Sequence, residues 1–346
     1  MVKITIGENE AGQRLDRFLK KYYNMAPLSA IYRMIRKDVK VNGKRAAQET
    51  ILSSGDELCV YITDEQDSEF RKAREIKRAR KSFKIAYEDE NLLVAEKPAG
   101  LLTHGDRHEK KNHLTNQVIS YLIEKGEYSP RVEKTFTPSP ANRLDRNTSG
   151  LVLFGKTAAA LRTANRMIRE EGYVSKFYLT VVAGHMASAL DLRDMMEKDA
   201  ATNTVRVFDE AGGETGGAGE PTEPSGKLMQ TRAVPLAYGK LGREEFTLVE
   251  VELITGRTHQ IRAHLSKAGY PIIGDAKYGK RRVNDLVGRN FGLTTQLLHA
   301  YRLEFLKGED ELSYMEGKVI KSELTPEEAR IVGEIFGEKG NYPNEH

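Results

Sequence analysis

The beginning of the chain alternates between patterns typical of strands and of helices. Apolar and polar residues alternate over 1–10, which predicts a short strand. Apolar residues at helical spacing then predict helices over 13–23 and 28–37. An Asn-Gly pair, which accepts the positive φ of a tight turn, predicts a hairpin over 39–44. With a further strand over 57–62, the pattern indicates a small unit of two helices and a sheet.

Strand and helix patterns also alternate over 83–306, without the repeated strand–helix–strand units of a doubly wound sheet. This order favours an α+β fold. Residues 209–227 are rich in Gly, Glu, Pro and Thr, without apolar periodicity, and are predicted to form a flexible surface insertion between two strands. The predicted strands span 84–87, 92–97, 150–154, 176–182 and 245–253, and the predicted helices span 114–124, 157–170 and 258–268.

Composition restricts the classes of protein to which the chain can belong. Its 346 residues suit two or three domains, at roughly 150 residues per domain. No apolar stretch approaches the roughly 18 residues of a membrane span, and the N-terminus lacks the apolar core of a secretory signal. Cys59 is the single cysteine, which excludes an internal disulfide and a multi-cysteine metal site. We therefore expect a cytoplasmic protein with no membrane partner.

Charge is unevenly distributed along the chain, although the net charge is only +4. Residues 71–84 hold eight basic side chains and one glutamate, a local balance of +7. An acidic patch precedes them, so we predict a charged linker over 63–82. The chain turns acidic after Lys307, which predicts an acidic C-terminal extension over 307–346. The basic segment suggests a polyanion as partner, and a solvated charged linker is the alternative.

The segment 142–150, Asn-Arg-Leu-Asp-Arg-Asn-Thr-Ser-Gly, has the densest candidate chemistry. Asp145 lies in a polar turn directly before a buried strand, between Arg143 and Arg146. Neighbouring positive charge favours an ionised carboxylate, which a nucleophile or a base requires. The alternative is a surface turn with an ordinary ion pair.

Two further segments place candidate side chains in or after apolar strands. Arg257 follows a buried strand at a Gly turn, where it could reach a carboxylate or a phosphate. Tyr178 lies within an apolar strand, where its ring could stack on a base. The alternative for Tyr178 is an ordinary tyrosine of the core.

Metal and nucleotide cofactors are not expected. His259 and His264 are five positions apart, whereas the histidines of a helical zinc site are spaced i, i+4 with a glutamate between them. Residues 274–280 match the phosphate-loop pattern G-x-x-x-x-G-K, but Arg281 stands where that loop needs Ser or Thr for magnesium. We therefore predict no metal site and no nucleotide-binding loop.

Residues 12–62 resemble the small RNA-binding domain named after ribosomal small-subunit protein four. The resemblance rests on Arg14-Leu15-Asp16, Arg33, Ile35, the hairpin of Val39, Asn42 and Gly43, and Gly55-Asp56. It implies that basic residues on one face of this domain contact RNA phosphates. The candidates are Arg33, Arg36, Lys37, Lys40 and Lys44. The alternative is a small αβ unit with an ordinary charged surface.

Four segments together resemble, in order, the motifs of the RluA-type RNA pseudouridine synthases, especially the ribosomal RluC/RluD branch. The resemblance covers 83–306 and implies the pseudouridine synthase fold, a mixed, mainly antiparallel central sheet with flanking helices and loops. Asn142 departs from the family pattern, which often has His there. The segments are E-K-P-A-G at 96–100, R-L-D-R-N-T-S-G at 143–150, K-F-Y at 176–178, and T-G-R-T-H-Q-I-R-A-H at 255–264, followed by G-Y-P-I-I-G-D at 269–275 and Y-G at 278–279.

The resemblance implies an isomerase that converts uridine to pseudouridine in RNA without a cofactor. Asp145 would start cleavage of the glycosidic bond, by attack on the sugar or by removal of a ribose proton, and the freed uracil would rejoin through carbon five. Arg257 would pair with Asp145 and orient it. Tyr178 would stack on the flipped base and help the final deprotonation, and Arg143 would fill the gap left in the RNA.

The ribosomal branch of the family implies large-subunit (23S) ribosomal RNA, or its precursor particle, as the partner. The same chemistry on transfer RNA is one alternative, and a non-catalytic RNA-binding factor of ribosome assembly is another. Nothing in the sequence requires more than a monomer.

Overall fold

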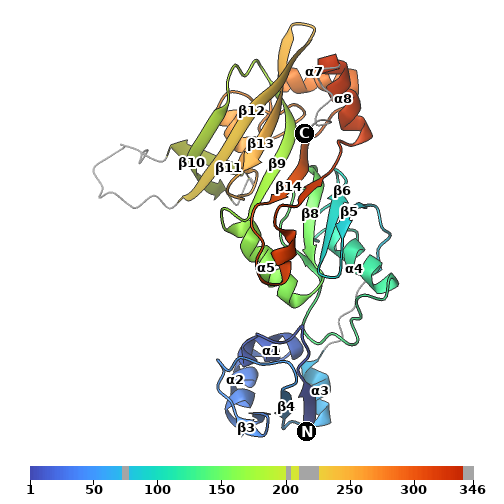
Figure 1. The fold of residues 1–346 in the computed structure, drawn as a ribbon, viewed down its shortest axis with the longest axis vertical. Coiled ribbons are helices and arrows are strands. Elements are labelled where there is room, and N and C mark those ends of the chain that lie inside the picture. The colour runs from blue at the N-terminus through green and yellow to red at the C-terminus, as the bar shows by residue number, and fades with distance from the viewer. Residues whose placement is uncertain (72–77, 200–203, 210–225, 338–346) are drawn as a thin grey trace, which may run out of the picture.

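The computed structural model describes residues 1–71, 78–199, 204–209 and 226–337. A small unit contains the N-terminus, drawn in blue, and a larger unit is built on a long sheet (Figure 1). Within the described ranges, no helix is long and apolar enough to cross a membrane.

The small unit has the two helices and the sheet that the sequence predicts. Asn42 and Gly43 have φ of 49° and 77°, so the Asn-Gly pair forms the predicted tight turn. The strand order is β1-β4-β2-β3, and the helices bury their apolar faces with this sheet in one core. The elements are β1 (Val2–Thr5), α1 (Leu15–Tyr22), α2 (Leu28–Lys37), β2 (Val39–Val41), β3 (Lys44–Arg45) and β4 (Glu57–Val60).

The predicted linker over 63–82 begins with a helix, α3 (Asp64–Phe70). Phe70, at the end of this helix, packs edge-on against Tyr23 of the small unit, with ring centroids 6.3 Å apart. The acidic half of the linker is therefore packed on the small unit. Residues 72–77 of the basic half lie outside the described residues.

The small unit is attached to the larger one by polar contacts as well as by the chain. Glu10 is 2% exposed, and its carboxylate accepts hydrogen bonds from the backbone N–H groups of Lys134 and Thr135 at 3.2 and 3.3 Å. The side-chain oxygen of Asn9 accepts a hydrogen bond of 2.9 Å from the first residue of α5 (Ala158–Arg169). These partners are far apart in the sequence, so no local pattern predicts the attachment.

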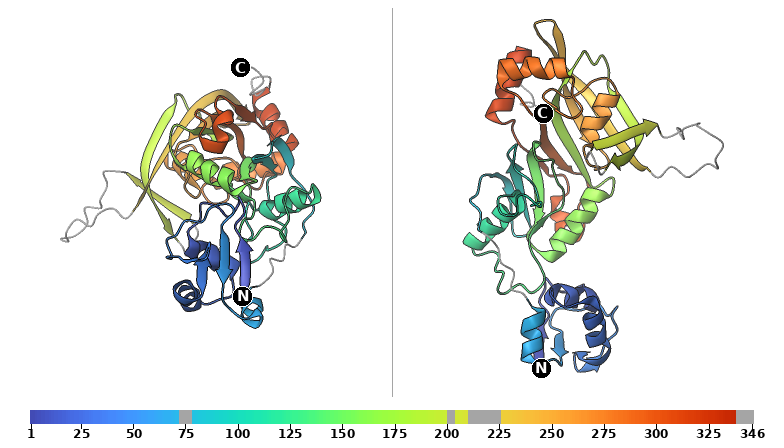
Figure 2. Two further views of the ribbon diagram at one scale, coloured as in Figure 1. Left: turned by 60° about the horizontal axis from the view of Figure 1, so that its bottom comes forward. Right: turned by 180° about the vertical axis from the view of Figure 1, so that it is seen from behind.

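The larger unit contains a mixed sheet with the strand order β11-β10-β12-β13-β9-β14-β8-β6-β5, with β7 on β8 and β15 on β14. Between described residues β8 and β14 form the parallel pair, and the other pairs are antiparallel. The expected α+β fold with a mainly antiparallel sheet is confirmed (Figure 2). The strands are β5 (Lys84–Glu88), β6 (Leu92–Lys97), β7 (Ser139–Pro140), β8 (Ser149–Gly155), β9 (Val174–Ala183), β10 (Leu190–Asp199), β11 (Thr204–Asp209), β12 (Lys227–Leu241), β13 (Glu244–Leu253), β14 (Leu298–Phe305) and β15 (Val319–Lys321).

Helices cover both faces of this sheet. Val152 and Phe154 of β8 share a core with α4, whereas the alternating residues Leu151 and Leu153 pack with α5 on the other face. Helix α6 packs on the α4 face, and α7 and α8 pack on the opposite face. The remaining helices are α4 (Leu114–Glu124), α6 (Gln260–Lys267), α7 (Arg281–Phe291) and α8 (Pro326–Phe336).

The predicted acidic extension is folded into the larger unit. It contains a 3-10 helix (Asp310–Met315), the strand β15 and helix α8. Ile331 and Val332 of α8 are 0% and 1% exposed, whereas Glu327 and Glu334 lie on the outer face of this amphipathic helix. The predicted domain limit at 306 is therefore too early, because acidic surface residues obscure the apolar face.

The predicted insertion over 209–227 lies between two strands, as expected. β11 ends at Asp209 and β12 begins at Lys227, and residues 210–225 lie outside the described residues. The sequence pattern does not predict the β10–β11 hairpin before it, because charged residues interrupt β10. One of them, Asp194, pairs with Lys267 of α6 at 2.7 Å.

Candidate active site

The sheet brings the Asp145 loop next to Tyr178. The loop leads into β8, where Gly150 pairs with Ala300 of β14, and Ala300 in turn pairs with Tyr178 of β9. Gly150 has φ of 105°, and a Cβ at this position would lie 2.1 Å from the carbonyl oxygen of Ala300. Glycine is therefore needed for the strands to approach in this way.

A buried lysine holds the Asp145 loop in place. Lys97, at the end of β6, is 1% exposed, and its Nζ donates to the carbonyl oxygens of Arg146 in the loop, at 2.9 Å, and of Leu101, at 2.7 Å. Burial lowers the pKa of Lys97 to about 7, and the carboxylates of Asp145 and Glu328 partly offset this. The Lys-Pro motif thus has a structural role beneath the loop.

The end of the loop is fixed by the C-terminal helix. The hydroxyl of Ser149 donates to a carboxylate oxygen of Glu328, in α8, at 2.5 Å. The same hydroxyl lies 2.8 Å from Nδ1 of His299 in β14. All three side chains are buried, so this contact ties the Asp145 loop to the last described helix.

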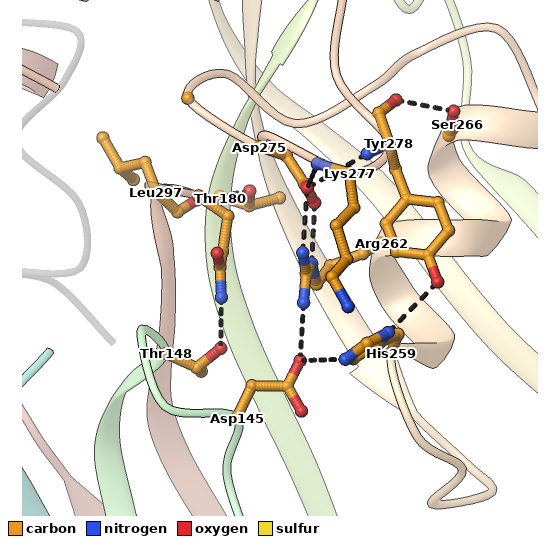
Figure 3. A network of polar contacts seen from close by, with 12 residues as sticks. Asp145, Thr148, Thr180, His259, Arg262, Ser266, Asp275, Lys277, Tyr278 and Leu297 are labelled. Atoms are coloured by element: carbon orange, nitrogen blue, oxygen red, sulfur yellow. Dashed lines mark hydrogen bonds and ion pairs between the residues drawn. The ribbon is translucent and has the colours of Figure 1, made fainter. Parts of the chain in front are cut away.

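Arg262 is the arginine that pairs with Asp145. Its Nη1 donates to Asp145 at 3.0 Å, and its Nε and Nη2 donate to Asp275 at 2.7 and 2.8 Å (Figure 3). The side chain of Asp275 is 0% exposed and that of Asp145 is 24% exposed. Burial alone lowers the pKa of Arg262, but the two carboxylates outweigh this and the net shift is upward. A permanently charged group therefore joins a buried carboxylate to one that meets solvent.

Arg257, the predicted partner of Asp145, is not the residue that pairs with it. Its Nε donates to the carbonyl oxygen of Leu228 in β12 at 3.3 Å, and the side chain is exposed. Arg257 lies in the turn after β13, whereas Arg262 lies inside α6 and is buried. The prediction that Arg257 orients Asp145 is therefore wrong, and Arg262 occupies that place.

His259 is the second group beside Asp145 that can carry a charge. Its Nε2 lies 3.8 Å from the carboxylate oxygen that Arg262 contacts, and its Nδ1 lies 3.1 Å from the hydroxyl of Tyr278. Burial lowers the pKa of His259, although Asp145 opposes this, so the imidazole is neutral at pH 7. Its φ of 54° lies in the left-handed region at the start of α6.

Asp145 and Tyr178 share a cleft of about 650 Å³, a size typical of small-ligand sites. Arg143 and Arg257 line the same cleft, and both are exposed. Burial raises the pKa of the Tyr178 phenol, and the Asp145 carboxylate adds to this shift, so the phenol is protonated near neutral pH. The cleft therefore combines the Asp145 carboxylate and the Tyr178 ring with exposed cations, to which Arg169 also belongs.

The five predicted RNA-contacting cations of the small unit lie on α2 and on the β2–β3 hairpin. Four are exposed and Lys40 is half-buried, with its Nζ 5.4 Å from the ring centre of Tyr61. In the described part of the chain none of the five forms an ion pair, so their charge is available to a polyanion. They are Arg33, Arg36, Lys37, Lys40 and Lys44.

Three residues of the site were absent from the predicted set: Arg262, His259 and Asp275. The first two lie in the T-G-R-T-H-Q-I-R segment, but His259 precedes α6 with positive φ, so helical spacing does not relate it to Arg262. Asp275 lies in the segment that matches the phosphate-loop pattern, and only the tertiary fold brings it to Arg262.

A family described as RNA pseudouridylate synthase matches residues 91–267 of the chain. This range contains Asp145, Tyr178 and the helix that carries Arg262. The chain belongs to the RNA pseudouridylate synthase family. It is therefore an RNA-modifying isomerase, and its motifs are those of the RluA type.

Curated members of this family align with most of the chain. Ribosomal large subunit pseudouridine synthase C of Salmonella typhi and of Escherichia coli K12 are each 34% identical over 312 residues, which is 87% of this chain and 88% of theirs. The protein of the same name from Vibrio parahaemolyticus is 32% identical over 307 residues, 87% of each chain.

Two human pseudouridylate synthase domain-containing proteins share the fold. RNA Pseudouridylate Synthase Domain Containing 1 gives a TM-score of 0.51 at 22% identity, over 73% of this chain and 86% of that one. RNA Pseudouridylate Synthase Domain Containing 4 gives 0.54 at 21% identity, over 71% and 91%. The expected pseudouridine synthase fold is thus confirmed.

Proposed function

We propose that this pseudouridine synthase isomerises uridines of large-subunit ribosomal RNA, with Asp145 as its catalytic carboxylate. The supporting observation is the position of Asp145, a partly exposed acid held by the buried Arg262 in a cleft that it shares with Tyr178. The substrate follows from the names of curated relatives, which align with 87% of this chain. We infer further that the enzyme acts as a cytoplasmic monomer without a metal or nucleotide cofactor.

The reaction exchanges one bond of the nucleoside for another. The bond between N1 and C1′ breaks, the uracil rotates, and C5 bonds to C1′. C5 then loses its proton, and N1 ends with one. Asp145 begins the sequence by attacking C1′ or by removing the proton of C2′. Arg262 orients this carboxylate, and Asp275 holds Arg262 in turn.

The other residues of the cleft serve the flipped nucleotide. Tyr178 supplies a stacking surface for uracil. Because its phenol is protonated near neutral pH, it meets the base as a hydrogen-bond donor and can accept a proton only when another group has taken its own. Arg143 fills the gap in the RNA, and the exposed Arg257 contacts a phosphate at the mouth of the cleft.

Asp145→Asn tests the catalytic assignment, because it keeps the shape of the side chain and removes its charge. Turnover is expected to fall by about a thousandfold or more, with RNA affinity within about threefold. Release of tritium from RNA labelled at C5 of uridine measures turnover, since C5 exchanges its hydrogen for the sugar bond. Retained turnover in the purified variant would refute the assignment.

Mapping of pseudouridine in total RNA, with and without the gene, tests the substrate. At least one position of large-subunit ribosomal RNA is expected to lose its modification. Loss at a transfer RNA position alone would support the alternative substrate, and an unchanged map would contradict activity on either RNA.

Salt dependence tests the small unit as an RNA contact. The triple variant Arg33→Gln/Arg36→Gln/Lys37→Gln is expected to flatten the slope of log affinity against log salt by roughly two to three, at about 0.7–0.9 per lost phosphate contact. Lys240→Gln, a cation paired with Glu245 at 2.9 Å, is the control. Equal slopes for the triple variant and the wild type would exclude these contacts.

A further inference from the structure

Tyr278 connects the partners of Asp145 to the β10–β11 hairpin. Its hydroxyl lies 3.1 Å from Nδ1 of His259 and accepts a hydrogen bond of 2.9 Å from the backbone N–H of Val205 in β11. Its ring lies against Arg262, with 5.2 Å between the ring centre and Cζ. The hydroxyl of Tyr278 points at the imidazole, and the other side of that imidazole faces Asp145 (Figure 3). One side chain therefore touches both groups that contact the carboxylate.

Hydrogen-bond chemistry determines which group donates and which accepts in each of these contacts. The N–H of Val205 can only donate, so the hydroxyl of Tyr278 accepts there and has its own proton to offer to Nδ1 of His259. Burial raises the pKa of Tyr278, although the Val205 bond opposes this, so that proton is present near neutral pH. His259 then carries its proton on Nε2, which faces Asp145. The other tautomer would turn a nitrogen lone pair toward the carboxylate.

The backbone of His259 is consistent with a functional constraint. Its φ of 54° is uncommon for a residue other than glycine, and such conformations cluster at functional sites. His259 precedes α6 without forming a side-chain cap, so local helix formation does not explain the conformation. The imidazole instead lies between Asp145 and Tyr278.

We propose that His259 and Tyr278 are positioning residues for Asp145 and that strand β11 braces them. This proposal rests on Asp145 being the catalytic carboxylate. The contacts from Val205 through Tyr278 to His259 hold a neutral N–H toward Asp145, and the ring of Tyr278 limits the movement of Arg262. The hairpin thus contributes to turnover through geometry, without touching the reacting atoms.

Tyr278→Phe removes the hydroxyl and keeps the ring against Arg262. We expect kcat to fall about tenfold with KM for RNA within about twofold, because a displaced catalytic group slows the chemistry more than the binding. Tyr238→Phe is the matched control, since its hydroxyl donates to the carbonyl of Met186 at 2.9 Å and lies outside the cleft. Unchanged kcat in Tyr278→Phe would overturn the proposal.

The pH profile separates positioning from a general loss of structure. Without the hydroxyl proton on Nδ1, the neutral imidazole loses a stabilising bond, so the pKa of His259 rises. In Tyr278→Phe, the pH below which kcat falls is therefore expected to be higher than in the wild type. An unchanged pH for this fall would contradict the proposal. The charged and titratable groups that act on His259 are Asp145, Arg262, Lys277, Asp275 and Tyr278.

A double-mutant cycle tests whether the residues act as one unit. His259→Asn shortens the side chain and keeps a residue that tolerates the left-handed backbone. The double variant with Tyr278→Phe is expected to lose no more than the worse single variant, and additive losses would contradict coupling. Val205→Pro removes this backbone donor from an edge strand, and it also changes a side chain that packs with Met196 and Met229. It should lower kcat in the same direction, and unchanged kcat would exclude the brace.

A measurement on the wild-type enzyme tests the proposal without depending on whether a variant folds. Nitrogen-15 spectra of labelled histidine are expected to show His259 neutral at pH 7 with its proton on Nε2, and a proton on Nδ1 would overturn the proposal. Asp145→Asn is measured in the same turnover assay. Retained turnover there refutes the catalytic assignment, whereas its loss beside an unaffected Tyr278→Phe refutes only the positioning role.

Discussion

Replacing Arg262 by glutamine removes the one charge that two carboxylates share. The side chain of Arg262 is 7% exposed and bonds Asp145 at 3.0 Å and Asp275 at 2.7 and 2.8 Å. Glutamine can donate from a single amide nitrogen and carries no charge. Asp275, which is 0% exposed, would then be left buried without a counter-charge.

The expected loss follows from the burial of these groups. Removing one member of a buried ion pair destabilises a protein by about 3–5 kcal/mol, because the charge left behind is uncompensated. Asp145 is 24% exposed and can regain water, so the penalty arises mainly at Asp275. We therefore expect Arg262→Gln to lower the free energy of unfolding by about 3–5 kcal/mol, a large part of the roughly 5–15 kcal/mol of a typical domain.

Urea unfolding followed by circular dichroism at pH 7 measures this loss. Arg257→Gln is the matched control, because it makes the same change five positions earlier on an exposed side chain. It is expected to change stability by less than about 0.5 kcal/mol. Arg262→Gln/Asp275→Asn removes the buried charge as well and should recover part of the loss. A loss below about 1 kcal/mol for Arg262→Gln, or equal losses for both arginines, would refute the reasoning.

Gly150→Ala is expected to cost at least about 2 kcal/mol, because the new Cβ would lie 2.1 Å from the Ala300 carbonyl oxygen. Gly172→Ala also has positive φ but meets nothing within 4 Å, so a cost of about 1 kcal/mol is expected, and similar melting temperatures for both would contradict the steric argument. Burial lowers the pKa of His264 from 6.5 to about 4, so the unfolded chain takes up that proton first as the pH falls. The free energy of unfolding should therefore fall by about 3 kcal/mol as the pH is lowered between these two pKa values. His264→Gln should lack this fall when unfolding is measured over a series of acidic pH values.

The periodic part of the fold could be predicted because buried faces leave a local pattern. α2 and α4 span Leu28–Lys37 and Leu114–Glu124, as their apolar spacing predicts. β10 could not be predicted, because the ion pair that makes Asp194 tolerable in it comes from another element. Docking of the small unit through Glu10 depends on partners more than a hundred residues away, which no local pattern contains.

The sequence predicts the Asp145 loop and Tyr178 of the candidate site but not the residues that support them. Asp145 and Tyr178 do share a cleft, but the register that joins them runs through Ala300 of a third strand. The error over the partner arginine follows from the start of α6. The predicted helix over 258–268 includes His259, whereas that residue precedes the helix in a left-handed conformation. The side-chain directions at this end of the helix depend on that backbone conformation.

The contact between Ser149 and Glu328 makes the Asp145 loop depend on a residue that is synthesised long after the loop itself. Glu328 is added about 180 residues after Ser149. At about 5–20 residues per second, this corresponds to a delay of roughly ten to thirty-five seconds. At the start of that time the nascent chain contains Asp145; Tyr178 and Arg262 are added during it, and the anchor of the loop comes last. The Asp145 loop therefore reaches the geometry seen in the structure only after α8 has been synthesised, and a chain interrupted before Glu328 contains Asp145, Tyr178 and Arg262 without this anchor.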